Sequence, residues 1–339
     1  MQRRGDVFSV LSYLIRRLLL AAGTLVVVSV IAFTIIQLPP GDYVDGYVGI
    51  LESMGDVITE EREEALRLQY GLYDPLIVQY LGWARDVLAG DFGLSLEYRI
   101  PVTEVIGDRM WMTVAVALAS VLLVWLMALP IGIYSAVRQY SVGDYAFTFI
   151  GFLGLAIPNF LLALVLMYFS FRYLGANVGG LFSNEYLDAP WSLEKFWDLL
   201  GHIWIPAIVL GTSGTAALIR IMRANLLDEL RKPYVVAAKA RGMSEWGLIL
   251  KYPVRVALNP FASTIGYILP YIVSGSIIVS VVLSLPTVGP LLLRALIAQD
   301  LYLSGAIIML IGYMTVVGTF ISDLILVWLD PRIRVADGQ

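Results

Sequence analysis

The sequence contains no cysteine and only one histidine among its 339 residues. The absence of cysteine excludes a disulfide framework and thiolate metal sites. One histidine, His202, makes a histidine-based metal centre or a Ser-His-Asp triad implausible. His202 lies between Trp197 and Trp204, beside an apolar run, so we expect it at the surface or in an aromatic belt at the membrane interface rather than in a proton relay.

Charge is also scarce. Asp, Glu, Lys and Arg make up 15% of the chain, against 59% hydrophobic residues, and the mean hydropathy is +0.79. A soluble domain would be about half apolar and about one quarter charged. The basic residues flank apolar runs and form no separate arm, so nucleic-acid binding is not expected. The composition indicates a protein embedded in membrane lipid.

Several sequence motifs of energy conversion and catalysis are missing. The sequence has no GxxxxGK[ST] phosphate-binding loop and no HExxH, GxSxG or DxDxDG motif. It also has no series of carboxylates at mid-membrane depth, which an ion-driven carrier would often show. We therefore expect neither catalytic residues nor a cofactor in this chain. A transport subunit powered from elsewhere is favoured over a self-sufficient carrier or channel, and a membrane enzyme is the least favoured class.

Long apolar runs dominate the sequence. A hydrocarbon core of about 30 Å needs about 20 apolar helical residues. The fold class predicted is all-α, a polytopic membrane protein with six transmembrane helices, an external helical cap after the first, and a cytosolic helix between the fourth and fifth. The predicted spans are Leu18–Leu38, Met110–Val137, Tyr145–Phe171, Leu199–Ile219, Ser263–Leu285 and Leu301–Leu329.

The basic residues are sorted along the chain in a way that predicts orientation. Of the 23 Lys and Arg residues, 15 lie in the segments 1–17, 138–144, 220–255 and 330–339. The alternate segments are longer yet hold the other 8. Cytosolic loops of membrane proteins carry the excess of Lys and Arg. Both termini are therefore predicted to be cytosolic.

Three regions follow from this topology: residues 1–38 with the first span, an external cap loop at 39–109, and a five-helix core at 110–335. The cap loop holds 14 acidic and 5 basic residues. Helices are predicted in it over Thr59–Tyr70 and Leu76–Leu88. Its acidic face is either a solvated outer surface or a binding surface for a cationic partner.

Polar and helix-breaking residues inside the predicted spans are candidates for a translocation pathway. A proline within a span frees backbone groups that need partners in the bundle or in a wet cavity. Asn159 either lines such a pathway or joins helices. Asp323 is either functional or pairs with Arg220 or Arg332. The candidates are Pro158, Asn159, Thr212, Ser213, Ser274, Ser276, Ser280 and Asp323.

The polar cytosolic loop at 226–262 has a regular pattern. Short helices are predicted over Val236–Gly242 and Met243–Lys251, with Ser244 as the N-cap of the second. Pro233 should break the preceding helix, and Gly242 permits a sharp change of direction. The result would be a short helix parallel to the membrane, small enough to enter a groove on a partner protein.

These residues resemble a known family. Ala237-Ala238-x-x-x-Gly242 is similar to the cytoplasmic "EAA" loop of ABC importer permeases, and specifically to the dipeptide/oligopeptide permease family. Further motifs in the family's order extend the resemblance over almost the whole chain. They are Pro40-Gly41-Asp42, Gln69-Tyr70-Gly71-Leu72, Gly90-Asp91-Phe92-Gly93-x-Ser95 and Asp330-Pro331-Arg332-Ile333-Arg334.

The resemblance implies an assembly in a bacterial or archaeal inner membrane. It would consist of this non-catalytic chain, a second permease chain, two cytosolic ATPase subunits that bind ATP and Mg, and an external solute-binding protein. The cytosolic loop would dock on an ATPase as the coupling helix. The coupling residues implied are Ala237, Ala238, Lys239, Ala240, Arg241, Gly242, Met243, Ser244 and Glu245.

The sequence departs from the family's pattern at three places, two of which also depart from the peptide branch. Val236 replaces the leading Glu of the loop, as is common in that branch. Ser280 stands where an acid is usual, and Thr287 interrupts a Pro-Gly-x-Gly pattern. The uncharged version is similar to branch members associated with oligosaccharides or glycosides. An oligopeptide is the expected solute, with oligosaccharides or glycosides as the alternative.

Overall fold

The computed structural model describes residues 2–38, 41–53, 55, 59–175, 179–259, 261, 263 and 277–329. In these residues the regular structure is helical, apart from one isolated antiparallel bridge between Leu94 and Pro101. This confirms the predicted all-α class. The chain divides into two compact units. The N-terminal unit comprises residues 14–112 and 287–314, and the central unit comprises residues 1–13, 113–286 and 315–339.

Three helices in the described residues are long and apolar enough to cross a membrane. They are Arg17–Gln37 within α1 (Gln2–Gln37), α5 (Val102–Val137), and Leu301–Leu326 within α15 (Leu301–Leu329). Two bent helix pairs would raise the number to five if each is one span. The predicted span Ser263–Leu285 falls mostly outside the described residues. The composition of these helices supports a membrane protein, and the count of six stays a prediction.

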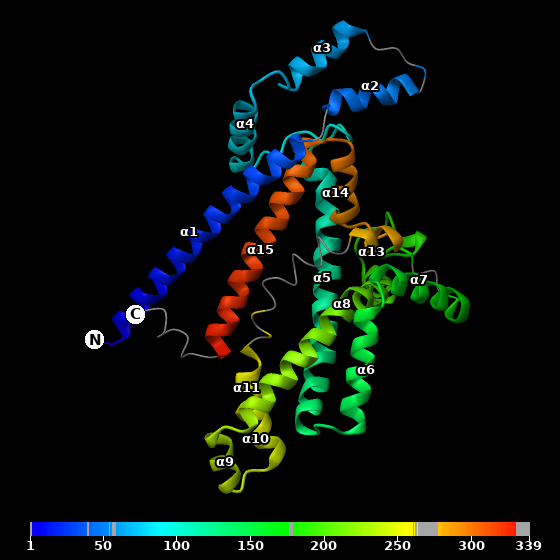
Figure 1. Ribbon diagram of the computed structural model, residues 1–339. Helices are drawn as coiled ribbons and strands as arrows, with labels where there is room; N and C mark the ends of the chain where they lie inside the picture. Colours follow the sequence, from blue (N-terminus) through cyan, green and yellow to red (C-terminus); the bar gives the residue numbers. More distant parts are fainter. Residues whose placement is uncertain are drawn as a thin grey trace. The chain divides into compact units, whose positions relative to one another are not determined.

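The prediction of one continuous helix over Tyr145–Phe171 is wrong. The chain forms α6 (Val142–Ala156) and α7 (Asn159–Phe169), which meet at 104° (Figure 1). Ile157 is extended at φ −84° and ψ 123°, and Pro158 precedes the first turn of α7. Proline disfavours helical backbone in the residue before it, because its ring crowds that residue. Pro158 therefore separates two helices instead of bending one.

Close contacts between α5 and α8 (Leu193–Leu230) in the central unit depend on glycine residues. A Cβ added to Gly132 of α5 would lie 2.6 Å from the Cβ of Met222 on α8. A Cβ on Gly211 of α8 would lie 3.0 Å from Val124 of α5. Neighbouring atoms would have to shift in both cases. Gly132 and Gly211 therefore allow α5 and α8 to approach closely.

His202 is buried, with 8% of its surface exposed, so its expected position at the surface is wrong. Its Nδ1 lies 2.8 Å from the carbonyl oxygen of Asp198, one turn earlier on α8. The Asp198 carboxylate in turn accepts hydrogen bonds from the backbone N–H and hydroxyl of Ser183, at 2.8 and 2.6 Å. A buried polar side chain needs such a partner. His202 thus bonds within α8, and Asp198 links the segment at Ser183 to this helix.

The N-terminal unit contains α2 (Tyr43–Ser53), α3 (Glu60–Gln69), α4 (Leu76–Leu88) and α14 (Val288–Ile297). The bounds of α3 and α4 confirm the two helices predicted in the cap loop. The sequence analysis did not predict α2. A small core forms around Val44 and Leu96, both buried. Tyr47, Val48, Leu66, Tyr70, Leu72 and Tyr302 pack against it.

The fully buried Asp300 fixes the Gly90–Ser95 motif against the start of α15. Its Oδ2 accepts the Ser95 hydroxyl at 2.6 Å and the Glu97 backbone N–H at 3.1 Å. Its Oδ1 accepts the backbone N–H of Leu303 at 3.0 Å, which caps α15. Gly93 has a φ of +74°, and a Cβ there would lie 2.6 Å from the Tyr302 ring. The motif therefore needs glycine both for its backbone conformation and for its close contact.

Candidate coupling surface and pathway

The candidate coupling loop begins where α8 ends at Leu230. Lys232 is extended, and Pro233 is the first residue of α9 (Pro233–Ala240). The prediction that the first short helix begins at Val236 is therefore wrong by one turn. Proline is favoured at the first helical position, because its missing N–H would have no helical partner there and its φ already suits a helix. Pro233 thus ends one helix and starts the next.

A turn at Gly242 connects α9 to the second short helix. Gly242 has a φ of +78°, and no heavy atom lies within 4 Å of the place where a Cβ would be. Ser244 occupies the N-cap position of α10 (Glu245–Lys251), but its side chain makes no capping hydrogen bond. After Tyr252 comes α11 (Pro253–Ala257). The two predicted helices and the change of direction between them are confirmed.

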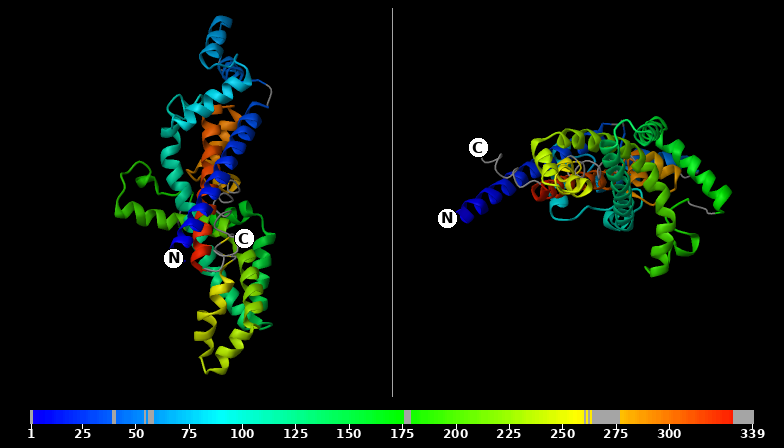
Figure 2. Two further views of the ribbon diagram at one scale, coloured as in Figure 1. Left: turned by 90° about the vertical axis from the view of Figure 1, so that its left-hand side faces the viewer. Right: turned by 90° about the horizontal axis from the view of Figure 1, so that it is seen from below.

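One side of this helical hairpin is buried. Val235, Leu248, Ile249 and Val254 are each less than 9% exposed. In Figures 1 and 2, α9, α10 and α11 fold back beside the last turns of α8. The loop is thus a packed structure with its own apolar contacts. It can present a surface of fixed shape.

The other side carries the nine predicted coupling residues. All are exposed except Ala238 and Met243, which are half-buried. Two large apolar residues flank them, Val236 at 62% exposure and Trp246 at 52%. The sequence analysis did not single out Trp246, although a tryptophan in a polar loop predicted to be cytosolic was a signal for a protein contact. The exposed surface combines small, basic and apolar groups.

A hydrogen bond ties the hairpin to α8. The Tyr234 hydroxyl donates to Glu229 Oε2 at 2.5 Å, across the break between α8 and α9. Burial first, and then the hydrogen bond and charge of Glu229, raise the pKa of the Tyr234 hydroxyl above its ordinary value. The raised pKa extends the protonated, donating form of the hydroxyl to more alkaline pH than in an ordinary tyrosine.

A second link joins α8 to the turn between α5 and α6. Arg223 Nε and Nη2 lie 3.1 and 3.0 Å from the two carboxylate oxygens of Asp144. Asp144 is 3% exposed and also accepts the Tyr140 backbone N–H at 3.0 Å. Ser141 caps α6 by accepting the Asp144 N–H. The sequence analysis missed this pair, since its partners are 79 positions apart in the sequence and nothing there indicated a contact.

The predicted pathway residues lie partly on helices that pack together. α7 packs against α8, and α13 (Ile277–Val282) packs against both. Asn159 is half-buried in the first turn of α7, and the Thr212 hydroxyl on α8 donates to the Ile208 carbonyl at 2.5 Å. Within the described residues, the buried Ser280 Oγ on α13 has no hydrogen-bond partner. The structure thus brings together the helices that carry Asn159, Thr212 and Ser280.

The remaining pathway candidates either lie on or next to a helix or fall outside the described residues. Pro158 precedes α7 at the 104° break. Asp323 is half-buried on α15. Ser274, Ser276 and Arg332, like the side chain of Ser213, lie outside the described part of the chain. The roles of all eight residues stay predictions.

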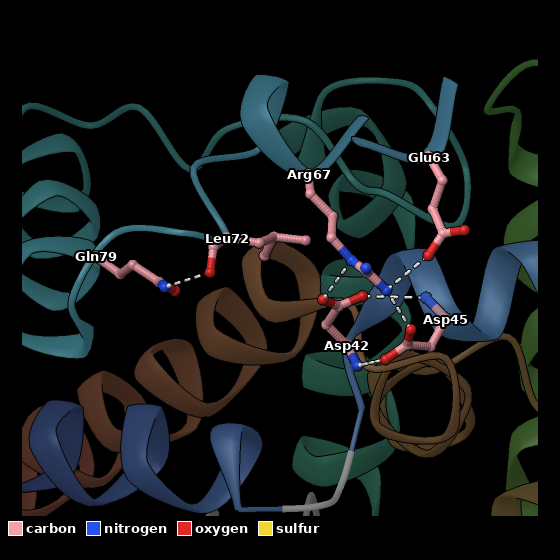
Figure 3. Close-up of polar contacts among 6 residues, drawn as sticks. All are labelled: Asp42, Asp45, Glu63, Arg67, Leu72 and Gln79. Atoms are coloured by element: carbon pink, nitrogen blue, oxygen red, sulfur yellow. Dashed lines mark hydrogen bonds and ion pairs between the residues drawn. The ribbon is translucent and has the colours of Figure 1, made fainter. Parts of the chain in front are cut away.

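The N-terminal unit contains a cavity of about 330 Å³ whose lining includes Asp42, Gln79, Trp83 and Gln299. Beside it, Arg67 gathers three carboxylates, as Figure 3 shows. Desolvation alone would lower the pKa of Arg67, but the surrounding carboxylates, Asp42 first among them, outweigh it and hold the pKa above its ordinary value. Arg67 pairs with Asp42 at 3.3 Å, with Glu63 at 3.0 Å, and with Asp45.

This network divides the acids of the cap. Asp42, Asp45 and Glu63 each pair with Arg67, whereas Glu60, Glu61 and Glu64 are exposed and form an acidic face of α3. Over the described residues, no group of three or more His, Asp or Glu side chains could hold a metal ion. The expectation that this chain binds no cofactor stays a prediction.

Comparison with known proteins matches two family models to the chain. The model described as "Binding-protein-dependent transport system inner membrane component" matches residues 128–335, and the N-terminal model of the same system matches residues 10–117. The chain is 34% identical to the oligopeptide transport system permease protein AppB of Bacillus subtilis, over 95% of this chain and 99% of that one. It is 33% identical to a putative peptide permease protein of Brucella ovis and 28% identical to the dipeptide transport system permease protein DppB of Escherichia coli, each over 96% and 99%.

Proposed function

The chain belongs to the family of binding-protein-dependent transport system inner membrane components, and from this premise we propose that it is the permease subunit of an ATP-driven importer of oligopeptides. The observation that carries the proposal is near-complete alignment with proteins named as oligopeptide, peptide and dipeptide permeases. These three names support a peptide solute, so the oligosaccharide alternative is not carried forward. The chain itself is a non-catalytic membrane component.

The assembly proposed around the chain has a second permease chain, two cytosolic ATPase subunits that bind ATP and Mg, and an external solute-binding protein. Six transmembrane helices with both termini in the cytosol are proposed for this chain. The sorting of Lys and Arg supports that orientation. The solute would pass between the two permease chains, beside the helices that carry Asn159, Thr212 and Ser280.

The exposed side of the α9–α10 hairpin is proposed to dock on an ATPase subunit. Its apolar residues Val236 and Trp246 are exposed on a hairpin that has its own buried side, so their exposure is not a consequence of disorder. Exposed apolar groups on a folded surface mark contact sites. When the two ATPase subunits close, the docked hairpin would move with them and would transmit this movement to α8.

Reconstitution of the full complex in proteoliposomes tests the proposed function. With external binding protein and internal ATP, a labelled tetra- or pentapeptide should accumulate in the vesicles, whereas an oligosaccharide of similar size should not. Vesicles that hold this chain alone should take up neither solute. Uptake by the chain alone would establish a self-sufficient carrier, and ATP-driven uptake of the oligosaccharide only would overturn the peptide assignment.

The acidic face of α3 gives a separate prediction for binding-protein docking. Replacement of Glu60, Glu61 and Glu64 by Lys should weaken association of the binding protein with the complex by at least about tenfold at low salt, because charge complementarity guides such encounters. Glu63 is left unchanged, since it pairs with Arg67. The control replaces Glu185, Asp188 and Glu194, also exposed, with the same change in net charge. Equal affinity in both variants, measured by surface plasmon resonance, would identify the α3 face as solvated only.

A further inference from the structure

α4 contacts α1 at a depth that an external, solvated helix would not reach. The Tyr80 hydroxyl lies 2.9 Å from Ser29 Oγ, and the Tyr80 ring packs edge-on against Phe33 at 5.5 Å. Ser29 is eight residues before Gln37, where the apolar span of α1 ends. At 1.5 Å per residue, Ser29 is about 12 Å from that end of the helix. α4 therefore extends beside the membrane-spanning part of α1.

On the side of α4 that faces α1, the Tyr80 and Gln79 side chains are paired, whereas the Nε1 of Trp83 has no hydrogen-bond partner within the described residues. Besides the Tyr80 bond to Ser29, the Gln79 side chain bonds the Gln37 side chain at 3.1 Å and the Asp74 carbonyl at 2.8 Å. At hydrocarbon depth each unpaired polar group would cost several kcal/mol, so internal pairing is required there. These bonds make a position within the bilayer tolerable for this face.

A different side of α4 is apolar and uncovered. Ile77, Leu81 and Leu88 are 66%, 59% and 89% exposed and form one stripe at helical spacing, with Ala84 completing it. The stripe lies about one third of a turn away from Tyr80 and Trp83. None of its residues lines the cavity of the N-terminal unit, which α4 meets with Gln79, Gly82 and Asp86 instead. At the edge of the stripe stands Arg85, with its side chain 80% exposed.

We propose that α4 is a membrane-embedded helix whose Ile77–Leu81–Leu88 stripe lies in the acyl chains of the outer leaflet. The adjacent α1, a candidate membrane span, likewise exposes apolar residues, among them Val26, Val30 and Ile35, as a helix in lipid does. An apolar stripe with a basic residue at its edge is the pattern of helices that lie in a membrane interface, where Arg extends to the head groups. The occupant of this surface is lipid. The inference rests on α1 spanning the membrane and not on the identity of the solute.

The absence of cysteine from the sequence makes a clean test possible, since each introduced cysteine is the only one in this chain. Leu81→Cys and Ile77→Cys carry a fluorescent label in the full complex, in vesicles containing lipids with a nitroxide on the acyl chain. Glu64→Cys on exposed α3 is the matched control, and Arg85→Cys samples the edge of the stripe. Partner subunits are used in cysteine-free form. Each variant must retain ATP-driven uptake.

The expected result is at least twofold quenching of the labels at Leu81 and Ile77 by the lipid-bound nitroxide, with aqueous iodide quenching them at least threefold less than the label at Glu64. The label at Arg85 should be intermediate. Equal iodide quenching at Leu81 and Glu64 would show a solvated face and overturn the proposal. Protection of Leu81 from both quenchers would show a protein partner on the stripe and overturn it equally.

Discussion

The Gly242→Asp variant should lose at least about tenfold in transport while its assembled complex still hydrolyses ATP. The side chain itself has room, because nothing lies within 4 Å of an added Cβ, so the variant adds a charge and the backbone strain of a positive φ but no steric clash. The new carboxylate would be placed in the proposed contact with the ATPase. A charge buried at an interface without a partner costs several kcal/mol, and about 1.4 kcal/mol corresponds to a factor of ten.

The Gly242→Asn variant separates charge from backbone strain. Gly242 has a φ of +78°, and Asn tolerates this left-handed region about as well as Asp does. Both variants therefore carry similar strain and volume, and they differ in one charge. Uptake and ATP hydrolysis are measured in the same proteoliposomes. If Asn and Asp reduce transport equally, the backbone of the turn matters and charge at the interface does not. Wild-type transport in both would remove the docking role from Gly242.

Some of the fold followed directly from local sequence. The helices α3 and α4 were predicted almost to the residue, because acids open α3, Pro75 precedes α4 and a glycine follows it. The turn at Gly242 was predicted since glycine next to a short helix permits a positive φ. α2 was not predicted. It is short and contains two glycines, and its packing around Val44 depends on residues distant in sequence, such as Tyr302.

Other features could not be read from single positions. Pro158 signalled a disturbance in a span, but a kink and a complete break have the same local signature. The coupling residues were predicted from the resemblance, whereas the exposure of Trp246 beside them appears only once α10 buries its opposite side, packed against α9 and α11. The buried environment of His202 is likewise a tertiary feature. Its partner Asp198 accepts hydrogen bonds from Ser183, which lies in the segment before α8. The local sequence predicts the backbone conformation, whereas tertiary contacts determine which side of a helix is buried.

The pair of Asp144 and Arg223 gives the largest expected effect on stability. Arg223→Met leaves the Asp144 carboxylate buried at 3% exposure without its cationic partner, while the Tyr140 backbone N–H still donates to it. Removing one partner of a buried ion pair costs about 3–5 kcal/mol, and partial exposure of Arg223 reduces this to about 2–4 kcal/mol here. The melting temperature of the purified complex should fall by about 5–10 °C.

The control is Arg220→Met, one turn earlier on α8. The Arg220 guanidinium lies over the Phe152 ring at 5.8 Å, and its loss should cost less than about 1 kcal/mol.

The double variant Asp144→Asn/Arg223→Met decides whether the ion pair itself is responsible. A neutral Asn can still accept the Tyr140 N–H, and it removes the buried charge that Arg223→Met leaves behind. The double variant should therefore be more stable than Arg223→Met alone, with a coupling energy of at least about 1.5 kcal/mol. Additive losses would mean that the two residues act separately. Arg223 lies in the last two turns of α8, directly before the coupling hairpin. Loss of the pair should loosen this end of α8, so that movement of the hairpin is transmitted less well to the rest of the helix. Transport should therefore fall more than ATP hydrolysis.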